Sequence, residues 1–385
     1  MKLAYVTTYD ASSLTESNNW SGTGYYIAQS LKKQSIPLEY IGSLNDPIHL
    51  KAVRKFKRHY CELFQNKNYQ KNPDPLTLKN YAKQVAKKLS IIGSDIVFSA
   101  TVDPIAYLEC EQPIVFWADA TFANIQDFYP QYSNLNNDVI YNWHQMENLA
   151  LQKAKLAIYS SDWAAQSAIQ EYGADPAKVK VIPFGSNVDS LFTHETIKDV
   201  IAARPTDRCK LLFLGVDWIR KGGSVAYEVA EKLNRSGLQT ELTIVGCPPI
   251  VDPPIPEFVK SLGFISKATS EGQERISQLL LESHFLILPT LADCTPIVFC
   301  EANSLGVPCL STTVGGVPTM IRNGINGQLF ALDGHITDYC DYIANLFTNY
   351  SDYKNLALSA FHEYESRLNW GVAGQKVKQF LTEII

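Results

Sequence analysis

The amino-acid sequence predicts an α/β protein with two domains, each built on a parallel β-sheet. Short apolar runs alternate with longer amphipathic stretches along the chain, a pattern typical of repeated strand–helix–strand units. The 385 residues suffice for two domains at roughly 150 residues each. Hydrophobic residues make up 46% of the chain and charged residues 19%, which predicts large buried cores and excludes disordered, collagen-like and coiled-coil proteins.

The apolar runs form two series of predicted strands. The first series covers residues 3–8, 38–41, 96–99, 114–117, 156–159 and 178–182. The second series covers residues 210–215, 241–245, 285–289, 308–311 and 327–330. Helical stretches lie between the strands of each series, which favours one open parallel sheet per domain.

A stretch without a convincing strand separates the two series and marks the predicted domain boundary. We interpret residues 191–208 as a linker between a first domain, residues 1–190, and a second domain, residues 209–365. Beyond Phe330 the pattern is helical to the end of the sequence. We expect the tail, residues 366–385, to pack on the first domain.

The eight cysteines occur singly, with no C-x-x-C pair and no Cys/His cluster at the spacing of zinc ligands. They indicate buried thiols in a reducing compartment, and no metal site is predicted. The N-terminal apolar run is too short for a signal-peptide core, and no segment reaches the ~18 to 20 apolar residues of a membrane span. We therefore expect a cytoplasmic protein.

A strongly basic segment is hidden within a net charge of −5, a total that argues against a nucleic-acid partner. Residues 48–90 carry eleven basic and two acidic side chains, a local charge of +9. Val53, Phe56 and Tyr60 recur there at i, i+3 and i+7, as in a basic amphipathic helix. One prediction is that residues 48–90 make peripheral contact with an anionic membrane, on its inner face, or hold an anionic acceptor. A helix with a solvated basic face is the alternative.

The first candidate binding loop is W-S-G-T-G-Y, residues 20–25, which follows the first predicted strand and opens a helix. Its glycines let the backbone approach a ligand closely, and a helix N-terminus favours an anion such as phosphate. The motif is not the G-x-G-x-x-G fingerprint of dinucleotide sites. A plain loop followed by a helix cap is the alternative.

The second candidate is G-V-D-W-I-R-K-G-G, residues 215–223, which follows the first strand of the second domain and opens its first helix. Cations at a helix N-terminus oppose the helix dipole at a cost of about 0.3–1 kcal/mol each. Arg220 and Lys221 at this place therefore indicate a bound anion, because lysine supplies a point charge and arginine a forked donor for phosphate oxygens. Two solvated charges beside a turn are the alternative.

The third and most specific candidate is P-T-L-A-D-C-T-P-I-V-F-C-E-A, residues 289–302. A predicted strand ends at Pro289, at the sheet edge where open α/β sheets bind ligands, and a helix begins near Pro296. Asp293 in the loop can accept hydrogen bonds from sugar hydroxyls, and Glu301 in the helix can bind the hydroxyl pair of a ribose. For Glu301, a solvent-exposed helix position is the alternative.

Together these motifs resemble those of the retaining glycosyltransferases of family 4. The resemblance covers most of the chain: besides the three motifs it includes S-S-D-W-A at 160–164, V-I-P-F-G-S-N-V-D at 181–189, G-V-P at 306–308, V-G-G-V-P at 314–318 and N-G-I-N-G at 323–327. It implies the GT-B fold, in which two Rossmann-like parallel-sheet domains face each other across a cleft and the C-terminal helices cross back to the N-terminal domain.

The activity implied by the resemblance is a glycosyltransferase of the hexosyltransferase kind. A sugar would pass from a nucleotide sugar, such as a UDP-, GDP- or ADP-sugar, to a glycan, a lipid-linked group or a small molecule. Front-face displacement would retain the anomeric configuration. Cations and helix N-termini would stabilise the leaving diphosphate, with no metal and no cofactor.

The resemblance also implies roles for individual residues. Lys221 and Arg220 would hold the donor diphosphate, Glu301 the nucleotide ribose, and Asp293 the transferred sugar. The implied donor-binding residues are, in addition, Gly22, Thr23, Phe264, Ile265, Thr295, Pro296, Ile297 and Val298.

The sequence departs from the family pattern at three places. Asp293 stands where the family usually has glutamate, and its side chain is shorter by one C–C bond of about 1.5 Å. Val216 stands where an arginine usually follows the glycine, which leaves Arg220 as the substitute. A histidine often present in the first domain is missing, and Asp119 and Thr121 occupy that stretch. We interpret Asp119 as the polar residue on the acceptor side, with a helix or turn cap as its alternative.

Two other kinds of function stay open at this point. One is another GT-B enzyme, such as a sugar-nucleotide epimerase or a phosphorylase; the two acidic residues argue against the first, and a pyridoxal-dependent phosphorylase needs a longer chain. The other is a non-catalytic nucleotide-sugar-binding protein or a scaffold of glycan assembly. Asp293, Val216 and the missing histidine are the features that favour it.

Overall fold

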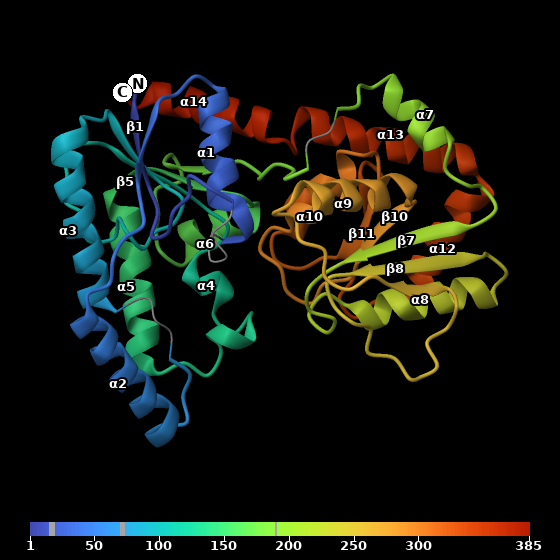
Figure 1. Ribbon diagram of the computed structural model, residues 1–385, viewed down its shortest axis with the longest axis horizontal. Helices are drawn as coiled ribbons and strands as arrows, with labels where there is room; N and C mark the ends of the chain where they lie inside the picture. The colour runs from blue at the N-terminus through green and yellow to red at the C-terminus, as the bar shows by residue number, and fades with distance from the viewer. Residues whose placement is uncertain (15–19, 70–73, 189–190) are drawn as a thin grey trace. The chain divides into compact units, whose positions relative to one another are not determined.

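The computed structural model describes residues 1–14, 20–69, 74–188 and 191–385. The chain forms two compact units, shown in Figure 1. The first comprises Met1–Ile182 and Ala373–Ile385, and the second comprises Pro183–Val372. Two residues of predicted features, Lys71 of the basic segment and Asp189 of the 181–189 motif, lie outside the described residues.

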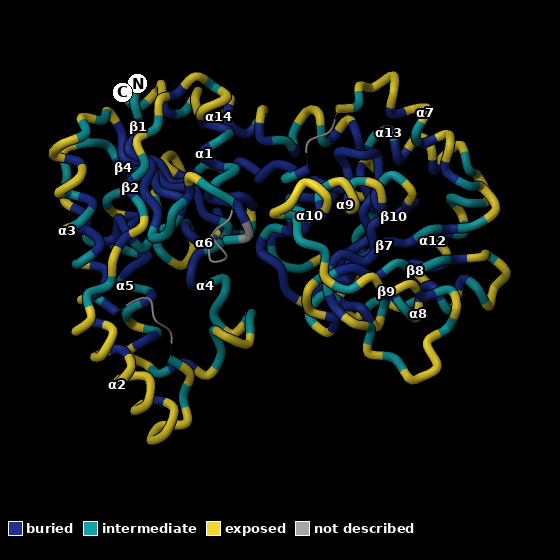
Figure 2. Tube along the Cα trace, viewed as in Figure 1, coloured by how far each residue is buried: buried dark blue, intermediate teal, exposed yellow. Residues whose placement is uncertain are grey.

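A parallel six-stranded sheet forms the centre of the first unit, in the order β2-β1-β3-β4-β5-β6. Its strands are β1 (Leu3–Val6), β2 (Leu38–Ile41), β3 (Ile96–Ser99), β4 (Ile114–Ala118), β5 (Ala154–Tyr159) and β6 (Val179–Val181). Every residue of β1, β3 and β4 is buried. Their uninterrupted apolar runs follow from this, because helices cover both faces of a parallel sheet (Figure 2).

Helices connect the strands of this first sheet. They are α1 (Thr23–Lys33), α2 (Ile48–Phe64), α3 (Pro75–Ile92), α4 (Phe122–Ile125), α5 (Asn137–Lys153) and α6 (Asp162–Gln170), with the short 3₁₀ turns η1 (Trp20–Gly22) and η2 (Pro130–Tyr132). Polar side chains cap several of them: Asp74 accepts from the first amides of α3, and Ser161 accepts from Ala164 N at the start of α6.

The last helix, α14 (Trp370–Glu383), begins in the second unit and ends in the first. Lys378 Nζ donates to the carbonyl oxygen of Gln34 at 2.9 Å. A Cβ at Gly374 would lie 2.6 Å from the carbonyl oxygen of Ser30, so glycine permits a close approach of α14 to α1. Of the C-terminal helices, α14 thus crosses back to the first unit. The part of the expected tail, residues 366–385, that belongs to this unit begins at Ala373.

The second unit contains another parallel six-stranded sheet, in the order β12-β11-β10-β7-β8-β9. Its strands are β7 (Cys209–Leu214), β8 (Thr240–Val245), β9 (Val259–Ser261), β10 (Phe285–Leu288), β11 (Cys309–Thr312) and β12 (Gly327–Phe330). Its helices are α7 (Thr196–Ala202), α8 (Gly223–Arg235), α9 (Ser270–Glu282), α10 (Ile297–Asn303), α11 (Val317–Met320), α12 (Ile336–Thr348) and α13 (Tyr350–Ser366). The predicted class, two parallel-sheet α/β units, is confirmed.

The region expected to be a linker is packed into the second unit. It contains α7, whose Ile197 and Ile201 are buried in the core. Arg204 is also buried, and its guanidinium donates to the carbonyl oxygens of Gly306 at 2.7 Å and Leu305 at 2.9 Å. The chain therefore passes into the second unit at Pro183 rather than through an exposed linker at residues 191–208.

The described part of the chain contains neither a membrane-spanning helix nor a cluster of metal ligands. No helix there is long and apolar enough to cross a bilayer. No group of three or more His, Cys, Asp and Glu side chains in it is arranged to hold a metal ion. All eight cysteines are free thiols, and all but the half-buried Cys110 are buried.

The core of the first unit contains an unusual carboxyl group. Glu147 of α5 is 3% exposed; its Oε1 accepts from Phe122 N at 3.2 Å, and its Oε2 has no hydrogen-bond partner among the described residues. Burial, reinforced by the negative charge of Asp103 and opposed by the bond from Phe122, raises the pKa of Glu147 to about 8. Glu147 is therefore protonated at neutral pH and carries no charge where it meets the start of α4.

Replacing Glu147 by glutamine should flatten the pH dependence of stability. The folded protein keeps this proton to about pH 8, whereas the ordinary pKa is 4.5, so unfolding releases a proton in between. This group alone should lower the free energy of unfolding by about 1.4 kcal/mol per pH unit as the pH rises through that window. Urea unfolding across it should show the slope in the wild type and in the exposed-site control Glu171→Gln, but not in Glu147→Gln. Equal slopes in all three proteins would contradict the assignment.

Candidate functional site

The order of strands in the second sheet creates a switch point between β7 and β10. The chain lays β8 and β9 on one side of β7 and places β10, β11 and β12 on its other side. Open α/β sheets bind ligands beyond the carboxyl ends of their strands at such a point. The R-K-G-G turn follows β7, and the loop with Asp293 follows β10. The two strongest motifs of the sequence therefore flank the switch point of one sheet.

Hydrogen bonds fasten the R-K-G-G turn to the loop after β10. The carbonyl oxygen of Arg220 accepts from Leu291 N at 2.7 Å and from Thr290 Oγ1 at 3.1 Å. Arg220 Nη1 in turn donates to the carbonyl oxygen of Ala292 at 2.8 Å. Residues about seventy positions apart in the chain are thus held in register by backbone and side-chain bonds.

Two glycines make this close approach possible. Gly222 has φ +75°, and a Cβ there would lie 1.9 Å from the carbonyl oxygen of Pro289. At Gly223 a Cβ would lie 2.2 Å from the ring of the buried Trp218. A side chain at either position would push the turn away from β10 or displace the tryptophan. The glycines therefore have a packing role, whether or not a ligand is present.

Lys221 and Asp293 form an ion pair across the two loops. Lys221 Nζ donates to Asp293 Oδ2, and Arg220 Nη1 lies 3.8 Å from the same oxygen. Asp293 is nearly buried, at 8% exposed. Its carboxylate is therefore the anion that faces the two cations before the start of α8. From sequence, we interpret Arg220 and Lys221 as binding an anionic ligand. The structure modifies this, because Asp293 already supplies part of the negative charge near them.

Glu301, the second acidic residue of the motif, also pairs with a lysine. It lies on α10 with no exposed surface, so the solvent-exposed alternative for Glu301 is wrong. Lys267 Nζ donates to both of its carboxylate oxygens, at 2.7 and 2.9 Å. Lys267 belongs to the loop between β9 and α9, and the sequence interpretation missed it. A buried carboxylate requires a cation or several donors, but nothing in the sequence shows which lysine supplies them.

The other residues expected to bind the donor in the second unit lie on the loop after β9 and around the start of α10. Phe264 is 71% exposed, and Ile265 packs partly against the core. Pro296 is the residue before α10, and no side chain caps the start of that helix. Thr295, Ile297 and Val298 around it are half-buried.

Three expected site residues belong to the first unit. Gly22, at φ +84°, immediately precedes α1, and the buried Thr23 is the first residue of that helix. They follow β1, which lies at the switch point of the first sheet, between β2 and β3. Asp119 directly follows β4 and is half-buried. Thr121 caps α4, with Oγ1 accepting from Asn124 N at 3.3 Å, so Asp119 is not the cap of that helix.

Removing Lys267 should destabilise the protein more than breaking a surface pair. Lys267→Met leaves the buried carboxylate of Glu301 without its donor, at a cost of about 1–3 kcal/mol. Lys260→Met is the matched control, since Lys260 pairs with Glu241 at 2.6 Å on a more exposed surface and should cost about 0–1 kcal/mol.

Urea unfolding of these single variants and of Lys267→Met combined with Glu301→Gln checks this pairing. The double variant should recover part of the stability, because the amide carries no charge to compensate. Equal losses of unfolding free energy for Lys267→Met and Lys260→Met would show that the buried pair with Glu301 contributes no more to stability than a surface pair.

Comparison with known sequences gives a family match over the second unit. Residues 208–349 match the family described as "Glycosyl transferases group 1". The D-inositol 3-phosphate glycosyltransferase of Mycolicibacterium smegmatis is 24% identical over 242 residues, covering 58% of this chain and 52% of that protein. The enzyme of the same name from Rhodococcus erythropolis is 26% identical over 211 residues, covering 51% and 46%. The chain thus spans about half the length of the curated relatives it matches.

Solved structures resemble the whole chain in fold. The lipopolysaccharide outer core galactosyltransferase WaaB has a TM-score of 0.67 at 15% identity, with complete coverage of both chains. A glycosyltransferase from Rickettsia africae has a TM-score of 0.66 at 17% identity, covering 100% of this chain and 98% of that one. HepE from Anabaena, solved in complex with UDP and glucose, has a TM-score of 0.63 at 16% identity, covering 99% of each chain. The resemblance predicted from the motifs is confirmed: the chain has the GT-B fold of glycosyltransferases, and its residues 208–349 carry the signature of their group 1 family.

Proposed function

We propose that this protein is a retaining glycosyltransferase that transfers a sugar from a nucleotide sugar to an acceptor. One observation carries the proposal: two buried carboxylates, Asp293 and Glu301, each pair with a lysine on the loops around the switch point of the second sheet. The family match over residues 208–349 and the complex of HepE with UDP and glucose support a nucleotide-sugar donor.

In this proposal the donor diphosphate replaces the carboxylate of Asp293 as the anion bound by Lys221 and Arg220. A diphosphate carries more negative charge than one carboxylate, so it competes effectively for Lys221 and Arg220. Asp293 would then be free to accept hydrogen bonds from the transferred sugar, and Glu301 from the ribose hydroxyls. The amides near Thr295 and Val298 would contact the sugar and phosphates, and the loop at Phe264 would meet the base.

The chemical step would be a front-face displacement. The bond from the anomeric carbon to the diphosphate oxygen breaks, and the acceptor oxygen bonds to that carbon on the same face. The acceptor's proton passes to the leaving phosphate. Lys221 and Arg220 would stabilise the charge that develops on the leaving diphosphate. In comparable sites each such donor contributes about 3–4 kcal/mol.

The first unit would supply the remaining contacts. The backbone at Gly22 and Thr23 would approach the diphosphate, and Asp119 would orient the acceptor. Asp119 is suited to this because it directly follows a central strand, at the sheet edge where open α/β sheets bind ligands. A non-catalytic nucleotide-sugar-binding protein is the second candidate, favoured by Asp293 and Val216 at positions where the family usually has glutamate and arginine.

Nucleoside diphosphates should stabilise the protein through Lys221. Binding at about 100 times the dissociation constant adds about 2.7 kcal/mol of stability, which raises the melting temperature by several degrees. The shift should appear with at least one of UDP, GDP and ADP in the presence of EDTA, and Lys221→Ala should abolish it. Lys232→Ala, an exposed lysine in the last turn of α8, is the matched control and should keep it. No shift with any of the three diphosphates would contradict the donor site.

Turnover separates the enzyme from the non-catalytic binder. A screen of nucleotide sugars for donor hydrolysis and transfer should find one donor that is used, and NMR of the product should show the donor's anomeric configuration. Asp293→Asn and Glu301→Gln should each lower kcat/KM by 100-fold or more, on the order of the loss of about 3 kcal/mol of transition-state stabilisation. Nucleotide binding without turnover of any donor would favour the binder, and an inverted product would exclude the retaining mechanism.

A further inference from the structure

One side of α2 is apolar and faces solvent. Phe56, Leu63 and Phe64 are 74%, 74% and 78% exposed, and Tyr60 beside them is 48% exposed. These residues recur at the spacing of neighbouring turns, so they form a continuous stripe along the helix. A helix of a globular protein normally turns such a stripe toward the core. We call these four residues, with Val53, the apolar stripe of α2.

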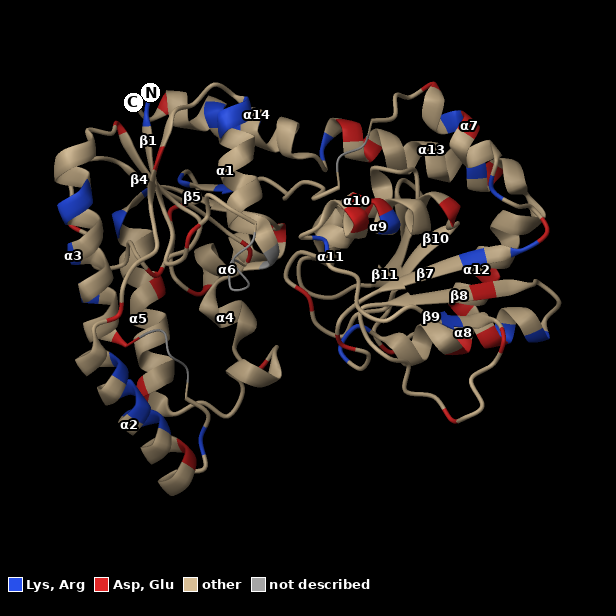
Figure 3. Ribbon diagram, in the orientation of Figure 1, with Lys and Arg blue, Asp and Glu red and all other residues tan. Residues whose placement is uncertain are grey.

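A basic stripe runs along the same helix. Lys51, Lys55 and Arg58 recur at i, i+4 and i+7 and are all exposed. Within the described ranges, none of the three forms an ion pair. In Figure 3 the ribbon of α2 carries several Lys and Arg positions, coloured blue. A surface that approaches this side of α2 therefore meets these three cations, with the exposed carboxylate of Glu62 one turn beyond Arg58.

The third side of α2 holds the helix to the first unit. Leu50, Arg54 and Cys61 are buried there. Arg54 donates to Asp46 Oδ2 at 2.7 Å and to Thr77 Oγ1 at 2.8 Å. The guanidinium of Arg54 therefore has a structural role and is not available to a partner.

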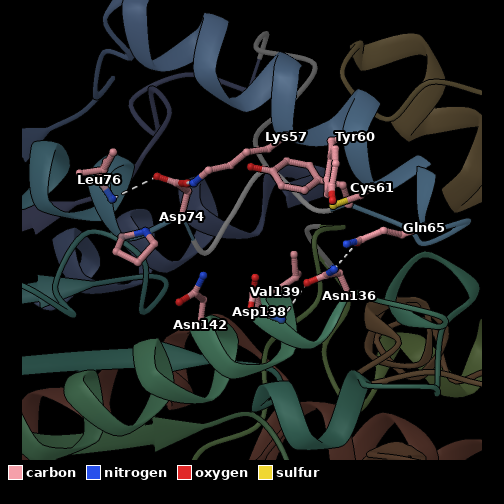
Figure 4. Close-up of a pocket in the computed structure, with 12 residues that line it drawn as sticks. Lys57, Tyr60, Cys61, Gln65, Asp74, Leu76, Asn136, Asp138, Val139 and Asn142 are labelled. Carbon is pink, nitrogen blue, oxygen red and sulfur yellow. Dashed lines mark hydrogen bonds and ion pairs between the residues drawn. The ribbon is translucent and has the colours of Figure 1, made fainter. Parts of the chain in front are cut away.

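A cavity of about 490 Å³ lies behind this inner side, between α2 and the starts of α3 and α5 (Figure 4). Lys57 Nζ donates to Asp74 Oδ2 across one end of it, and Asn136 Nδ2 donates to Gln65 Oε1 across the other. None of the expected site residues lines it. These two bonds tie α2 to the starts of α3 and α5. Tyr60 of the apolar stripe also lines the cavity, whereas Phe56, Leu63 and Phe64 do not.

We propose that the outer side of α2 docks onto the surface of an anionic lipid bilayer. At about 100° per residue, the two stripes lie on either side of the line opposite the buried inner side. Of the stripe residues, Leu63, Phe56 and Lys55 lie nearest to that line, so a flat surface meets these three first. Helices that lie in a membrane interface combine such an apolar side with flanking Lys and Arg. A merely solvated basic side would account for Lys55 and Arg58, but not for Phe56, Leu63 and Phe64 in water.

Flotation of the whole protein with lipid vesicles tests the proposal. Vesicles with about one third phosphatidylglycerol should carry the wild type upward at low salt, and pure phosphatidylcholine vesicles should not. Neutralising the basic stripe as Lys51→Gln, Lys55→Gln and Arg58→Gln should lower the partition coefficient on the order of 100-fold, since each cation near an anionic surface contributes about fivefold. The triple variant Phe56→Ser, Leu63→Ser and Phe64→Ser should lower it at least as much.

The matched control removes the same charge from α3. Lys79, Lys83 and Lys87 form an exposed stripe there, and their change to glutamine should leave partitioning within about threefold of the wild type if only α2 docks. Equal loss in the α2 and α3 variants would overturn the proposal in favour of a diffuse charge effect. Absence of binding to phosphatidylglycerol vesicles would overturn it as well, and so would concentration-dependent self-association that the serine variant abolishes.

Melting temperatures close to that of the wild type would confirm that these variants fold, as expected for side chains that contact little of the core. Nucleoside diphosphate binding should be unchanged in all of them. The docking surface can therefore fail without the donor site failing, and the reverse also holds.

Discussion

The candidate site depends on the bonding between the turn after β7 and the loop after β10. The carbonyl oxygen of Arg220 accepts two hydrogen bonds from that loop, and Gly222 comes so close to Pro289 that no side chain fits between them. Lys221 and Asp293 can pair only because these contacts bring their backbones together. If the turn moved away from β10, the cations would lose both their position and their carboxylate.

In the second unit, the two carboxylates proposed to bind the donor form ion pairs. Two carboxylates are removed from water, and each is compensated by one lysine: Asp293 by Lys221 and Glu301 by Lys267. Breaking such a pair without a replacement is costly, whereas exchanging one partner for a ligand of the same charge is not. In the proposed function, a diphosphate replaces Asp293 as the anion, and ribose hydroxyls meet Glu301. In the first unit, the buried carboxyl group of Glu147 has no cation partner among the described residues. It is protonated instead, because burial raises its pKa to about 8.

The sequence predicted the fold well because both sheets are parallel and buried. Each strand of such a sheet is a short apolar run, and every run expected from the sequence became a strand. The missed strand, β9, is a sheet edge where Lys260 and Ser261 face solvent, so it has no apolar run to reveal it. The missed helix α7 exposes most of its residues and hides only Ile197 and Ile201, too few to show a period.

Pairing between distant side chains could not be predicted in the same way. The sequence contains Lys267 and Glu301 as ordinary residues 34 positions apart, and only the fold brings them together. Likewise, a count of charges over residues 48–90 treats Arg54 like Lys55, although Arg54 is bonded to Asp46 and Lys55 is exposed. Local composition predicts where charge accumulates along the chain. Which charges remain available to a ligand depends on tertiary contacts.

A crystal structure with a nucleoside diphosphate bound tests the exchange of ion-pair partners most directly. We predict that Lys221 Nζ will donate to a phosphate oxygen instead of Asp293 Oδ2, at a distance of about 2.7–2.9 Å. We also predict that Glu301 will accept hydrogen bonds from the ribose hydroxyls. A diphosphate bound elsewhere, with the Lys221–Asp293 and Lys267–Glu301 pairs intact, would contradict it.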